Sequence, residues 1–355
     1  MLQSILGKIL MAPFALLYGF TIGIRNVLYE SELVKSTRFS LPVISVGNLS
    51  IGGAGKTPHI EYLIRLLSPY INVSTLSRGY KRKTKGFRFV RPADNVLDAG
   101  DEPLMYARKH RGVVVAVGES RAIAIPQMVA RHPSLQTVLL DDAFQHRSIK
   151  PALNILLTTW DEPFTRDYLL PSGRLREWRS AYTRADVIIV SKCPPEITEE
   201  EKAQMIKEIN PQKHQNIYFS YYQYGYPYNF YNPKQLIKLD KELDVILISA
   251  IANTSYLLAY LDNEVLDIHH MNYEDHHLFS DLDIEYINTV FKNRDSKRKL
   301  ILTTEKDAMR LDLHRKKLGE LNLPIYVLPM QVQFHGEDQE RFDADIKEFL
   351  LHFKS

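Results

Sequence analysis

The stretch that decides the fold is Gly47–Thr57, GNLSIGGAGKT, which lies between an apolar segment and a helical pattern. The preceding segment, Pro42–Gly47 (PVISVG), is apolar and partly β-branched, as expected of a buried strand. The following segment, Thr57–Leu67, carries apolar residues at helical spacing. A strand, a glycine-rich loop and a helix in this order predict a phosphate-binding P-loop, in which backbone N–H groups surround the phosphates.

The end of this loop supplies the side chains that P-loop chemistry needs. Lys56 is placed to reach the β- and γ-phosphates, and Thr57 to hold Mg²⁺. The strict pattern has a glycine where this chain has Ser50, but the later glycines keep the loop flexible. The alternative, a glycine-rich turn that contains Lys-Thr by chance, fits the strand-loop-helix context poorly. The predicted nucleotide-binding residues are Gly52, Gly53, Ala54, Gly55, Lys56 and Thr57.

A P-loop enzyme also needs a carboxylate near Mg²⁺ at the end of a neighbouring strand. The segment Val138–Asp142 (VLLDD) has the expected form, an apolar strand that ends in two acids. Acids at strand ends are common, so this pair indicates a metal site only in combination with the P-loop. Asp141 and Asp142 are therefore the predicted metal ligands, together with Thr57.

Short apolar segments alternate with helical stretches along most of the chain, which predicts parallel βα units. A tyrosine-rich segment, Tyr218–Tyr231, separates two such series and is expected to connect them as extended strands. The predicted fold class is α/β, with a P-loop NTPase-like parallel-sheet lobe and a second, smaller α/β lobe. The expected units are an N-terminal membrane-interface helix (1–30), the P-loop nucleotide-binding domain (31–220), a linker (221–232), a second α/β domain (233–335) and a C-terminal helix that packs back on a lobe (336–355). The strands expected in the second domain are 245–249, 265–268, 300–303 and 325–328, with helices at 281–292 and 305–313.

The N-terminal segment has no charged residue from Ile9 to Ile24. These sixteen residues are fewer than the roughly 20 that a spanning helix needs. No small-residue cleavage site follows them, so a signal peptide is disfavoured. A buried core helix and a helix in the membrane interface remain as interpretations. We favour the second, with Tyr18 and Tyr29 at the level of the lipid headgroups.

Composition limits the remaining possibilities. A single cysteine, Cys193, excludes an internal disulfide and fits a reducing compartment. The net charge of +3 is small for bulk nucleic-acid binding. The stretch Arg78–Arg91 nevertheless holds seven basic residues in fourteen positions, interleaved with aromatic residues. It could contact RNA, lie against anionic headgroups or remain a solvated loop, and the apolar N-terminal segment favours the membrane over nucleic acid.

Eight motifs follow one another across nearly the whole chain: GNLSIGGAGKTP, SRGY (Ser77–Tyr80), GDEP (Gly100–Pro103), GESR (Gly118–Arg121), DDAFQHR (Asp141–Arg147), LPSGRLRE (Leu170–Glu177), YEDHHLF (Tyr273–Phe279) and TTEKDA (Thr303–Ala308). In this order they resemble the motifs of the tetraacyldisaccharide 4'-kinases. The resemblance implies ATP and Mg²⁺ as cosubstrates and phosphorylation of the 4'-hydroxyl of a tetraacyldisaccharide 1-phosphate, a lipid A precursor. It also implies peripheral or monotopic attachment to the cytoplasmic face of the bacterial inner membrane. Neither nucleic acid nor an obligate protein partner is expected. One departure is Ala143, where the family usually has a glycine after the acid pair.

The resemblance also implies roles for single residues. Asp101 of GDEP and His276 of YEDHH look like the pair that accepts the proton of the attacking hydroxyl, and which of the two takes it is left open. Asp101 could instead cap a helix that begins near Pro103. A zinc site is the other alternative for the four histidines at 269, 270, 276 and 277, but no cysteine is near and adjacent histidines do not share a helical face.

Arg121 and Arg176 look like clamps for phosphate or substrate, because a guanidinium matches anions with several oxygens. Ordinary surface salt bridges are the alternative for both arginines.

A nucleotide-dependent switch at the membrane is the competing function class. A guanine-specific switch would show Asn-Lys-x-Asp after a late strand, and Ser191–Pro194 (SKCP) lies there without the aspartate. Whether ATP consumption depends on a lipid acceptor distinguishes the kinase from the switch. An RNA-handling P-loop enzyme is a third possibility that rests only on the basic stretch.

Overall fold

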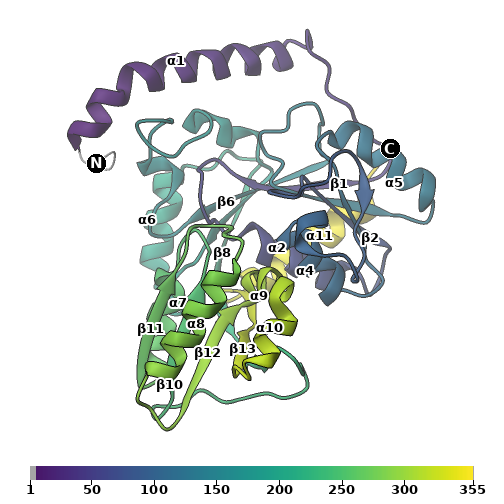
Figure 1. The fold of residues 1–355 in the computed structure, drawn as a ribbon. Coiled ribbons are helices and arrows are strands. Elements are labelled where there is room, and N and C mark those ends of the chain that lie inside the picture. The colour runs from purple at the N-terminus through teal and green to yellow at the C-terminus, as the bar shows by residue number, and fades with distance from the viewer. Residues whose placement is uncertain (1–4, 355) are drawn as a thin grey trace.

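The computed structural model describes residues 5–354 as two lobes, each built around its own sheet (Figure 1). The larger sheet, in the P-loop lobe, has the strand order β14-β8-β7-β6-β1-β5-β2-β4-β3. It is parallel except at its two edges, where β3 and β14 pair antiparallel with their neighbours. Its strands are β1 Val43–Asn48, β2 Val73–Ser77, β3 Arg88–Phe89, β4 Val114–Val117, β5 Thr137–Asp141, β6 Leu153–Thr159, β7 Val187–Ser191, β8 Asn216–Tyr224 and β14 Met330–Phe334.

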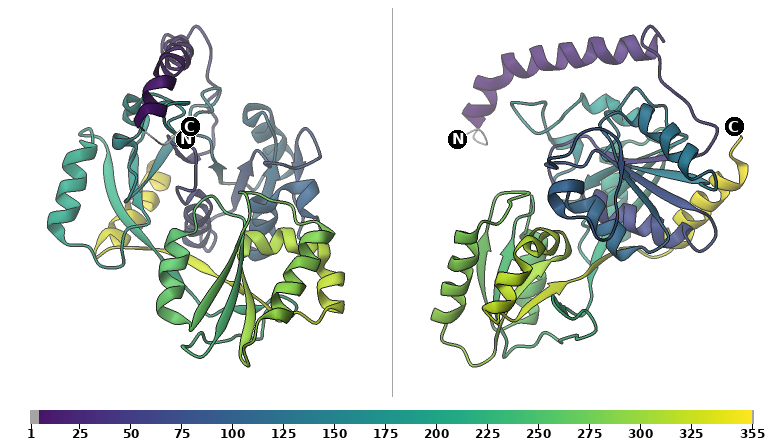
Figure 2. Two further views of the ribbon diagram at one scale, coloured as in Figure 1. Left: turned by 60° about the vertical axis from the view of Figure 1, so that its left-hand side comes forward. Right: turned by 45° about the vertical axis from the view of Figure 1, so that its right-hand side comes forward.

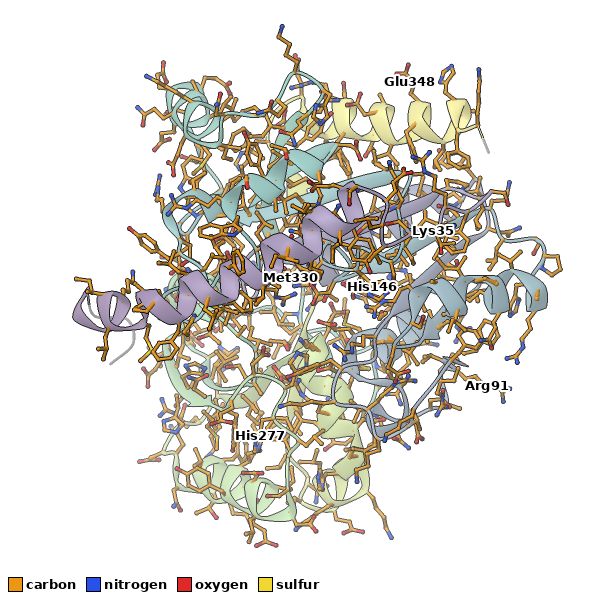
Figure 3. The ribbon with its side chains drawn as sticks, turned by 90° about the horizontal axis from the view of Figure 1, so that it is seen from above. Lys35, Arg91, His146, His277, Met330 and Glu348 are labelled. Atoms are coloured by element: carbon orange, nitrogen blue, oxygen red, sulfur yellow. The ribbon has the colours of Figure 1, made fainter. Side chains whose placement is uncertain are left out.

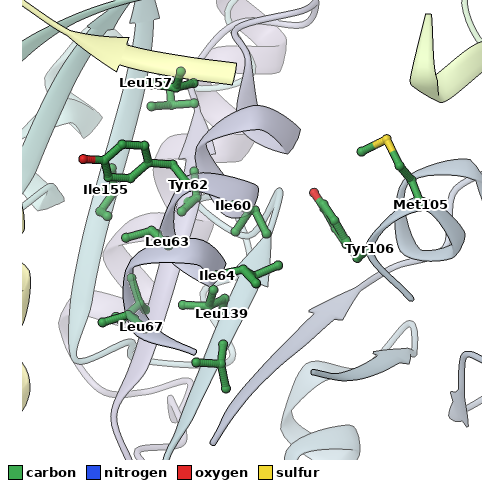
Figure 4. Packing of buried hydrophobic residues seen from close by; sticks show 14 of the residues in the cluster. Ile60, Tyr62, Leu63, Ile64, Leu67, Met105, Tyr106, Leu139, Ile155 and Leu157 are labelled. Atoms are coloured by element: carbon green, nitrogen blue, oxygen red, sulfur yellow. The ribbon is translucent and has the colours of Figure 1, made fainter. Parts of the chain in front are cut away.

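Helices cover both faces of this sheet. The helices of the P-loop lobe are α1 Ile5–Glu30, α2 Lys56–Leu67, α3 Val96–Ala99, α4 Asp101–Lys109, α5 Arg121–Arg131, α6 Glu199–Ile209 and α11 Asp338–His352, with single turns η1 Phe164–Arg166 and η2 Arg179–Arg184. Successive strand residues point to opposite faces. On β5, Leu139 therefore joins the core under α2 and α4, whereas Val138 and Leu140 join the core under α5. Figure 4 shows the α2 side of this packing.

The second lobe holds a smaller sheet of order β11-β10-β12-β13-β9, parallel except for β9. Its strands are β9 Tyr228–Asn229, β10 Asp244–Ser249, β11 Asp267–Asn272, β12 Lys299–Thr304 and β13 Ile325–Leu328. Its helices are α7 Ser255–Glu264, α8 Asp281–Asn293, α9 Glu305–Leu311 and α10 Arg315–Glu320, with the single turn η3 Asp312–His314. The chain alternates strands and helices here as it does in the P-loop lobe, which agrees with the α/β class predicted from the sequence.

The chain passes between the lobes twice, after β8 and before β14 (Figure 2). These two strands pair antiparallel, from Ser220 opposite Phe334 to Tyr224 opposite Met330. The expected boundary at residue 335 was therefore wrong for 330–334, which belongs to the large sheet. Sequence periodicity does not reveal this, because a strand that returns to another sheet looks like any other short apolar strand. The last helix, α11, packs on the P-loop lobe through Phe342 and Ile346.

Helix α1 lies along the outside of the P-loop lobe and is mostly exposed (Figures 1 and 2). Among the described residues it is the one helix long and apolar enough to cross a membrane, and only 11% of that window is buried. Its large exposed apolar residues are Ile9, Leu10, Phe14, Leu16, Leu17, Phe20, Ile24 and Val27. A buried core helix is thus excluded for this segment.

A narrow face of α1 docks on the loop that contains LPSGRLRE. The Tyr18 hydroxyl donates to the backbone carbonyl of Arg176 (2.9 Å), and the Trp178 indole donates to the carbonyl of Gly19 (2.9 Å). Gly19 allows this contact, because an added Cβ would lie 2.5 Å from the Trp178 ring. Tyr29 lies under the guanidinium of Arg147. Each tyrosine therefore has a partner on the protein side, and its position at the level of the lipid headgroups stays a prediction.

His59 on α2 couples the P-loop to β8. Its Nδ1–H donates to the Gly55 carbonyl (2.7 Å) and its Nε2 accepts from the Ser220 hydroxyl (3.0 Å), the tautomer that these two partners require. The ring is 2% exposed, and this burial lowers the pKa of His59 to about 4.

Acid should therefore destabilise the protein partly through His59. The pKa of His59 in the folded state lies below the ordinary value of about 6.5. The stability that neutral, buried His59 contributes is therefore fully present above pH 6.5 and is lost as the pH falls toward 4. Between pH 7.5 and 5.0 we expect His59 to account for about 2 kcal/mol of lost unfolding free energy. Urea unfolding at both pH values measures this loss of unfolding free energy. His59→Gln, which retains a donor and an acceptor, should lose less stability than the wild type between the two pH values. An exposed-histidine control, His352→Gln, should match the wild type; equal losses in all three proteins would contradict the assignment.

Candidate active site

A cavity of about 740 Å³ lies between the lobes, where the P-loop faces the strand ends of the second sheet. The P-loop, the end of β5 and the first turn of α4 line one side. The loops that follow β10, β11 and β12 line the other side. Twelve residues were predicted from the sequence for catalysis, nucleotide binding or metal binding, and eleven of them line this cavity. The twelfth, Asp101, is buried and does not line it.

The P-loop presents unpaired backbone N–H groups to the cavity. Helix α2 begins at Lys56, and its N-cap, Gly55, has no side chain to cap the first turn. Gly55 has φ 86°, and an added Cβ would lie 2.1 Å from the Tyr222 hydroxyl. The Ser191 hydroxyl fixes the loop by donating to the Ala54 carbonyl (2.8 Å). An uncapped helix N-terminus with a partial positive charge is a ready anion site.

The two acids that end β5 have different surroundings. Asp141 is 2% exposed, and one carboxylate oxygen accepts from the Tyr106 hydroxyl (2.9 Å). Burial, reinforced by the negative charge of Glu102, raises the pKa of Asp141 to about 7. Asp142 is held by Arg176 (3.0 Å) and lies 3.5 Å from Lys56. Burial opposes its ionisation, but Lys56 and Arg176 outweigh burial and lower the pKa of Asp142.

The neighbourhood of Thr57 and the acid pair fits a divalent cation. The second oxygen of Asp141, Oδ1, is buried and has no hydrogen-bond partner. The Thr57 hydroxyl donates to Glu102 Oε1 (3.0 Å), so a second carboxylate lies beside it. Within residues 5–354 no three His, Cys, Asp or Glu side chains form a metal site by themselves. A nucleotide-bound Mg²⁺ takes most of its ligands from phosphates and water, so one or two carboxylates and a hydroxyl suffice.

The positive φ at this loop falls on Asp142 (φ 49°), not on Ala143. Ala143, where the family usually has glycine, therefore carries no strain from a positive φ. His276 is a second non-glycine residue with positive φ (58°). Such backbone conformations concentrate at functional sites, because only the surrounding structure holds them.

Asp101 and His276, which are 175 positions apart, meet between the lobes. Their Oδ2 and Nδ1 atoms are 2.9 Å apart. Asp101 is the first residue of α4 in the P-loop lobe, and His276 follows β11 in the second lobe. Tyr80 from SRGY lies against the imidazole, with ring centres 4.8 Å apart. Asp101 Oδ1 also accepts from the backbone N–H of Glu102 (2.9 Å), but the N-cap of α4 is Gly100, so Asp101 is not the cap that was considered as its alternative function.

Two residues that sequence reasoning missed hold this pair in place. Arg310 is 1% exposed and donates to Asp101 Oδ2 (2.5 Å) and to Asp307. Lys306 lies 3.2 Å from His276 Nε2 and 3.1 Å from Glu102. Both come from α9, which packs on α4. TTEKDA contains Lys306 and the GDEP motif contains Glu102, so the signal was present as charged residues beside strand and helix ends.

These cations set the charge state of Asp101. Burial opposes its ionisation, but Lys306, the His276 hydrogen bond and Arg310 outweigh burial and lower the pKa of Asp101 well below its usual range. The carboxylates of Glu102 and Asp101 likewise overcome burial and raise the pKa of Lys306. At neutral pH the carboxylate is therefore ionised and the lysine is protonated.

The two predicted arginine clamps differ in how well they are paired. Arg121 is 3% exposed and contacts only the backbone carbonyls of Glu119 and Asp141, each at 3.4 Å, while its Nε has no partner. Arg176 donates to Asp142 and to Gln145 (3.3 Å). Neither is an exposed surface salt bridge. The poorly paired guanidinium of Arg121 is suited to bind an anion.

The basic stretch 78–91 divides into two parts. Arg78 and Tyr80 line the cavity. Arg82 pairs with Glu119 (2.7 Å) and Arg88 with Asp94 (3.0 Å). The stretch is thus partly active-site wall and partly structural.

Comparison with known proteins gives a consistent result. A family model described as tetraacyldisaccharide-1-P 4'-kinase matches residues 7–351. Proteins named tetraacyldisaccharide 4'-kinase are 41% identical over 348 residues in Flavobacterium johnsoniae, covering 98% of each chain, and 39% identical over 346 residues in Bacteroides thetaiotaomicron, covering 94% of this chain and 91% of the other. A crystal structure of the apo form of LpxK from Aquifex aeolicus in complex with ATP is 28% identical, with a TM-score of 0.72, and covers 97% of this chain and 99% of its own. The chain, whose cleft joins a P-loop to an Asp–His pair, belongs to the tetraacyldisaccharide 4'-kinase family.

Proposed function

We propose that this protein transfers the γ-phosphoryl group of ATP to the 4'-hydroxyl of a tetraacyldisaccharide 1-phosphate, a lipid A precursor. The observation that carries the proposal is the Asp101–His276 pair, which lies across the cleft from an uncapped P-loop helix. A P-loop alone would also serve a switch, whereas a proton acceptor facing it serves a hydroxyl acceptor. The direct test is transfer from labelled ATP to the purified lipid, with the product identified by mass. ATP hydrolysis that does not depend on the lipid would instead favour the switch.

The P-loop side supplies positioning and charge. Backbone N–H groups of residues 52–57 and the start of α2 bind the phosphates, and Lys56 moves from Asn48 (3.0 Å) to the β- and γ-oxygens. Thr57, Asp141 and Asp142 would hold Mg²⁺, which neutralises charge between the β- and γ-phosphates when bound. Arg121 has unused donors to stabilise the transferring group.

On the acceptor side, His276 takes the proton and Asp101 orients it. Asp101 is ionised and accepts from His276 Nδ1–H, which leaves Nε2 as the basic ring atom. Lys306 lies at that atom but remains protonated, so it cannot accept the proton. The hydroxyl of the acceptor sugar gives its proton to Nε2 while its oxygen attacks the γ-phosphorus. The carboxylate then stabilises the imidazolium that forms.

Helix α1 attaches the enzyme to the cytoplasmic face of the inner membrane in this proposal. Its exposed side is almost entirely apolar, whereas its docked side reaches Arg176, whose side chain contacts Asp142. A helix lying in the interface buries such a side among the acyl chains. The active site then opens close to the layer in which a lipid acceptor resides.

Lys56→Ala and Asp142→Ala should each lower kcat by at least about 10³-fold, because both remove charge from the triphosphate–metal unit. The measurement is labelled phosphate transfer, with circular dichroism to verify the fold. Lys213→Ala and Asp295→Ala remove the same charges from exposed positions and should leave transfer unchanged. Near-normal turnover in either active-site variant would contradict the P-loop assignment.

Asp101→Ala and His276→Ala should each lower kcat by about 10² to 10⁴-fold, the usual contribution of proton transfer. The double variant should be little worse than the poorer single one, because the two residues act as a unit. His277→Ala is the matched control, since His277 pairs with Asp283 (3.0 Å) instead of the active-site carboxylate. Losses that multiply in the double variant, or a large fall in ATP affinity on Asp101→Ala, would contradict the pair.

Replacing the exposed residues Leu10, Leu17 and Phe20 by glutamine should release the protein from vesicles without unfolding it. Each change removes about 1 kcal/mol or more of apolar burial, so the vesicle partition coefficient should fall at least about 100-fold. Unlike a deletion of 1–24, these changes retain the Tyr18 and Gly19 contacts. Leu282→Gln, at an exposed position of the second lobe, is the control. Unchanged cosedimentation of the triple variant would contradict the membrane function of α1.

A further inference from the structure

A second cavity, of about 600 Å³, lies under the C-terminal end of α1. Its wall is formed by residues 29–38, which end and follow that helix, and by residues 143–151, which follow the acid pair. Figure 3 shows Lys35 and His146 beside this end of the helix. The cavity is separate from the nucleotide cleft and takes no part in the mechanism above.

The cavity is strongly basic, and much of its positive charge is not neutralised. Five cations line it, against the carboxylates of Glu30 and Glu32: Lys35, Arg38, Arg147, Lys150 and Arg184. Glu177, which does not line the cavity, forms an ion pair with Arg184 (Oε2 to Nη1, 3.0 Å). Within the described residues, the side chains of Lys35, Arg38 and Lys150 form no hydrogen bond or ion pair.

Arg147 is the buried member of this group. Its side chain is 14% exposed, its nearest acid is Glu30 at 3.6 Å, and its buried Nη1 donates no hydrogen bond. A buried guanidinium with an unused donor is costly unless an anion completes its hydrogen bonding. Phosphate offers several oxygens to such a donor and to the flexible ammonium groups around it.

The second cavity adjoins the active site through one residue. His146 lines both cavities, and the loop 142–147 that contains it forms the wall between them. Burial, together with Arg121 and Arg78, lowers the pKa of His146 to about 4. The imidazole is therefore neutral at pH 7 and adds no charge to this wall. A ligand that occupies both cavities must therefore pass beside this loop, close to Asp142.

We propose that this basic cavity binds the 1-phosphate of the acceptor while the other sugar presents its 4'-hydroxyl to His276. The inference rests on the proposed function, because the family description itself specifies a disaccharide 1-phosphate. Such a head group has an anion at one end and the reacting hydroxyl on the other ring. Two cavities that share a wall, of which the second lies under the end of α1, match that layout. The cavity then selects phosphorylated acceptors and fixes which ring reaches the γ-phosphate.

The same chemistry could bind the phosphate of an anionic phospholipid. The acceptor is favoured because the cavity adjoins the catalytic cleft, whereas a phospholipid would need no such connection. The acceptor phosphate and the phospholipid phosphate predict different effects of losing the site. Loss of an acceptor-phosphate site affects only acceptors that carry the phosphate. Loss of a phospholipid site affects all acceptors and varies with the anionic lipid content.

The test uses the full-length protein with Arg38→Gln/Lys150→Gln, two exposed changes that leave buried Arg147 intact. Transfer is measured with the disaccharide 1-phosphate and with the same lipid lacking the phosphate, in neutral detergent micelles and with added phosphatidylglycerol. For the wild type we expect a higher kcat/KM with the phosphorylated acceptor. In the variant KM for that acceptor should rise about tenfold or more, because charge-assisted contacts are lost. Its KM for ATP and its activity on the dephosphorylated acceptor should not change.

Lys213→Gln/Lys316→Gln removes the same charge elsewhere on the surface and should behave as the wild type. An unchanged preference for the phosphorylated acceptor would overturn the proposal. So would an equal loss on both acceptors that depends on phosphatidylglycerol, which would identify a phospholipid site. If the wild type phosphorylates neither lipid, the proposed function itself fails. That outcome is distinct from normal transfer with no effect of the variant.

Discussion

The carboxylate of Asp101 is the constraint on which the arrangement of the two lobes depends. It lies at the start of α4 in the P-loop lobe, yet its main partners, His276 and Arg310, belong to the second lobe. With 4% exposure, an ionised carboxylate without these partners would destabilise the fold by about 3 to 5 kcal/mol. The contact that prepares the proton acceptor in the proposed mechanism is therefore also a contact that holds the lobes together.

The cleft between the lobes contains both a positive and a negative region. The uncapped N-terminus of α2, Lys56 and Arg121 make one part of the cleft positive, whereas Glu102 and Asp141 make a negative site beside Thr57. A nucleotide with its cation matches both parts at once, because its phosphates meet the positive groups and its metal meets the carboxylates. Burial, reinforced by the negative charge of Glu102, raises the pKa of Asp141 in this part of the cleft.

The N-terminal helix α1 is in contact with the loop that holds one of the active-site arginines. Its docked face contacts the LPSGRLRE loop, and Arg176 of that loop is bonded both to Tyr18 and to Asp142. The exposed apolar face and the site of phosphate transfer are thus linked through one arginine. The second cavity also lies under the C-terminal end of α1, as expected if a lipid head group enters from the membrane.

The sequence by itself determined the parts that depend on local pattern. The GNLSIGGAGKT loop, the acids at the end of β5, the parallel α/β class and the apolar N-terminal helix all follow from spacing between near neighbours, and the structure agrees with each of them. The family motifs also indicated Asp101 and His276 as a pair before any contact between them was visible. Strand limits were less accurate: β11 begins two residues after the expected start at 265, and α7 was not predicted.

Only the tertiary structure decided the features that depend on partners far apart in sequence. Lys306 lies within the TTEKDA motif, whereas Arg310 lies outside it. The contacts of both with Asp101 and His276 join different elements, so no local pattern predicts those contacts. β14 returns to the large sheet because its partner is β8, more than a hundred residues earlier. The contact of Tyr18 with Arg176 likewise joins residues that are far apart in sequence. Periodicity records which face of an element is buried, but the identity of the neighbour depends on how the whole chain folds.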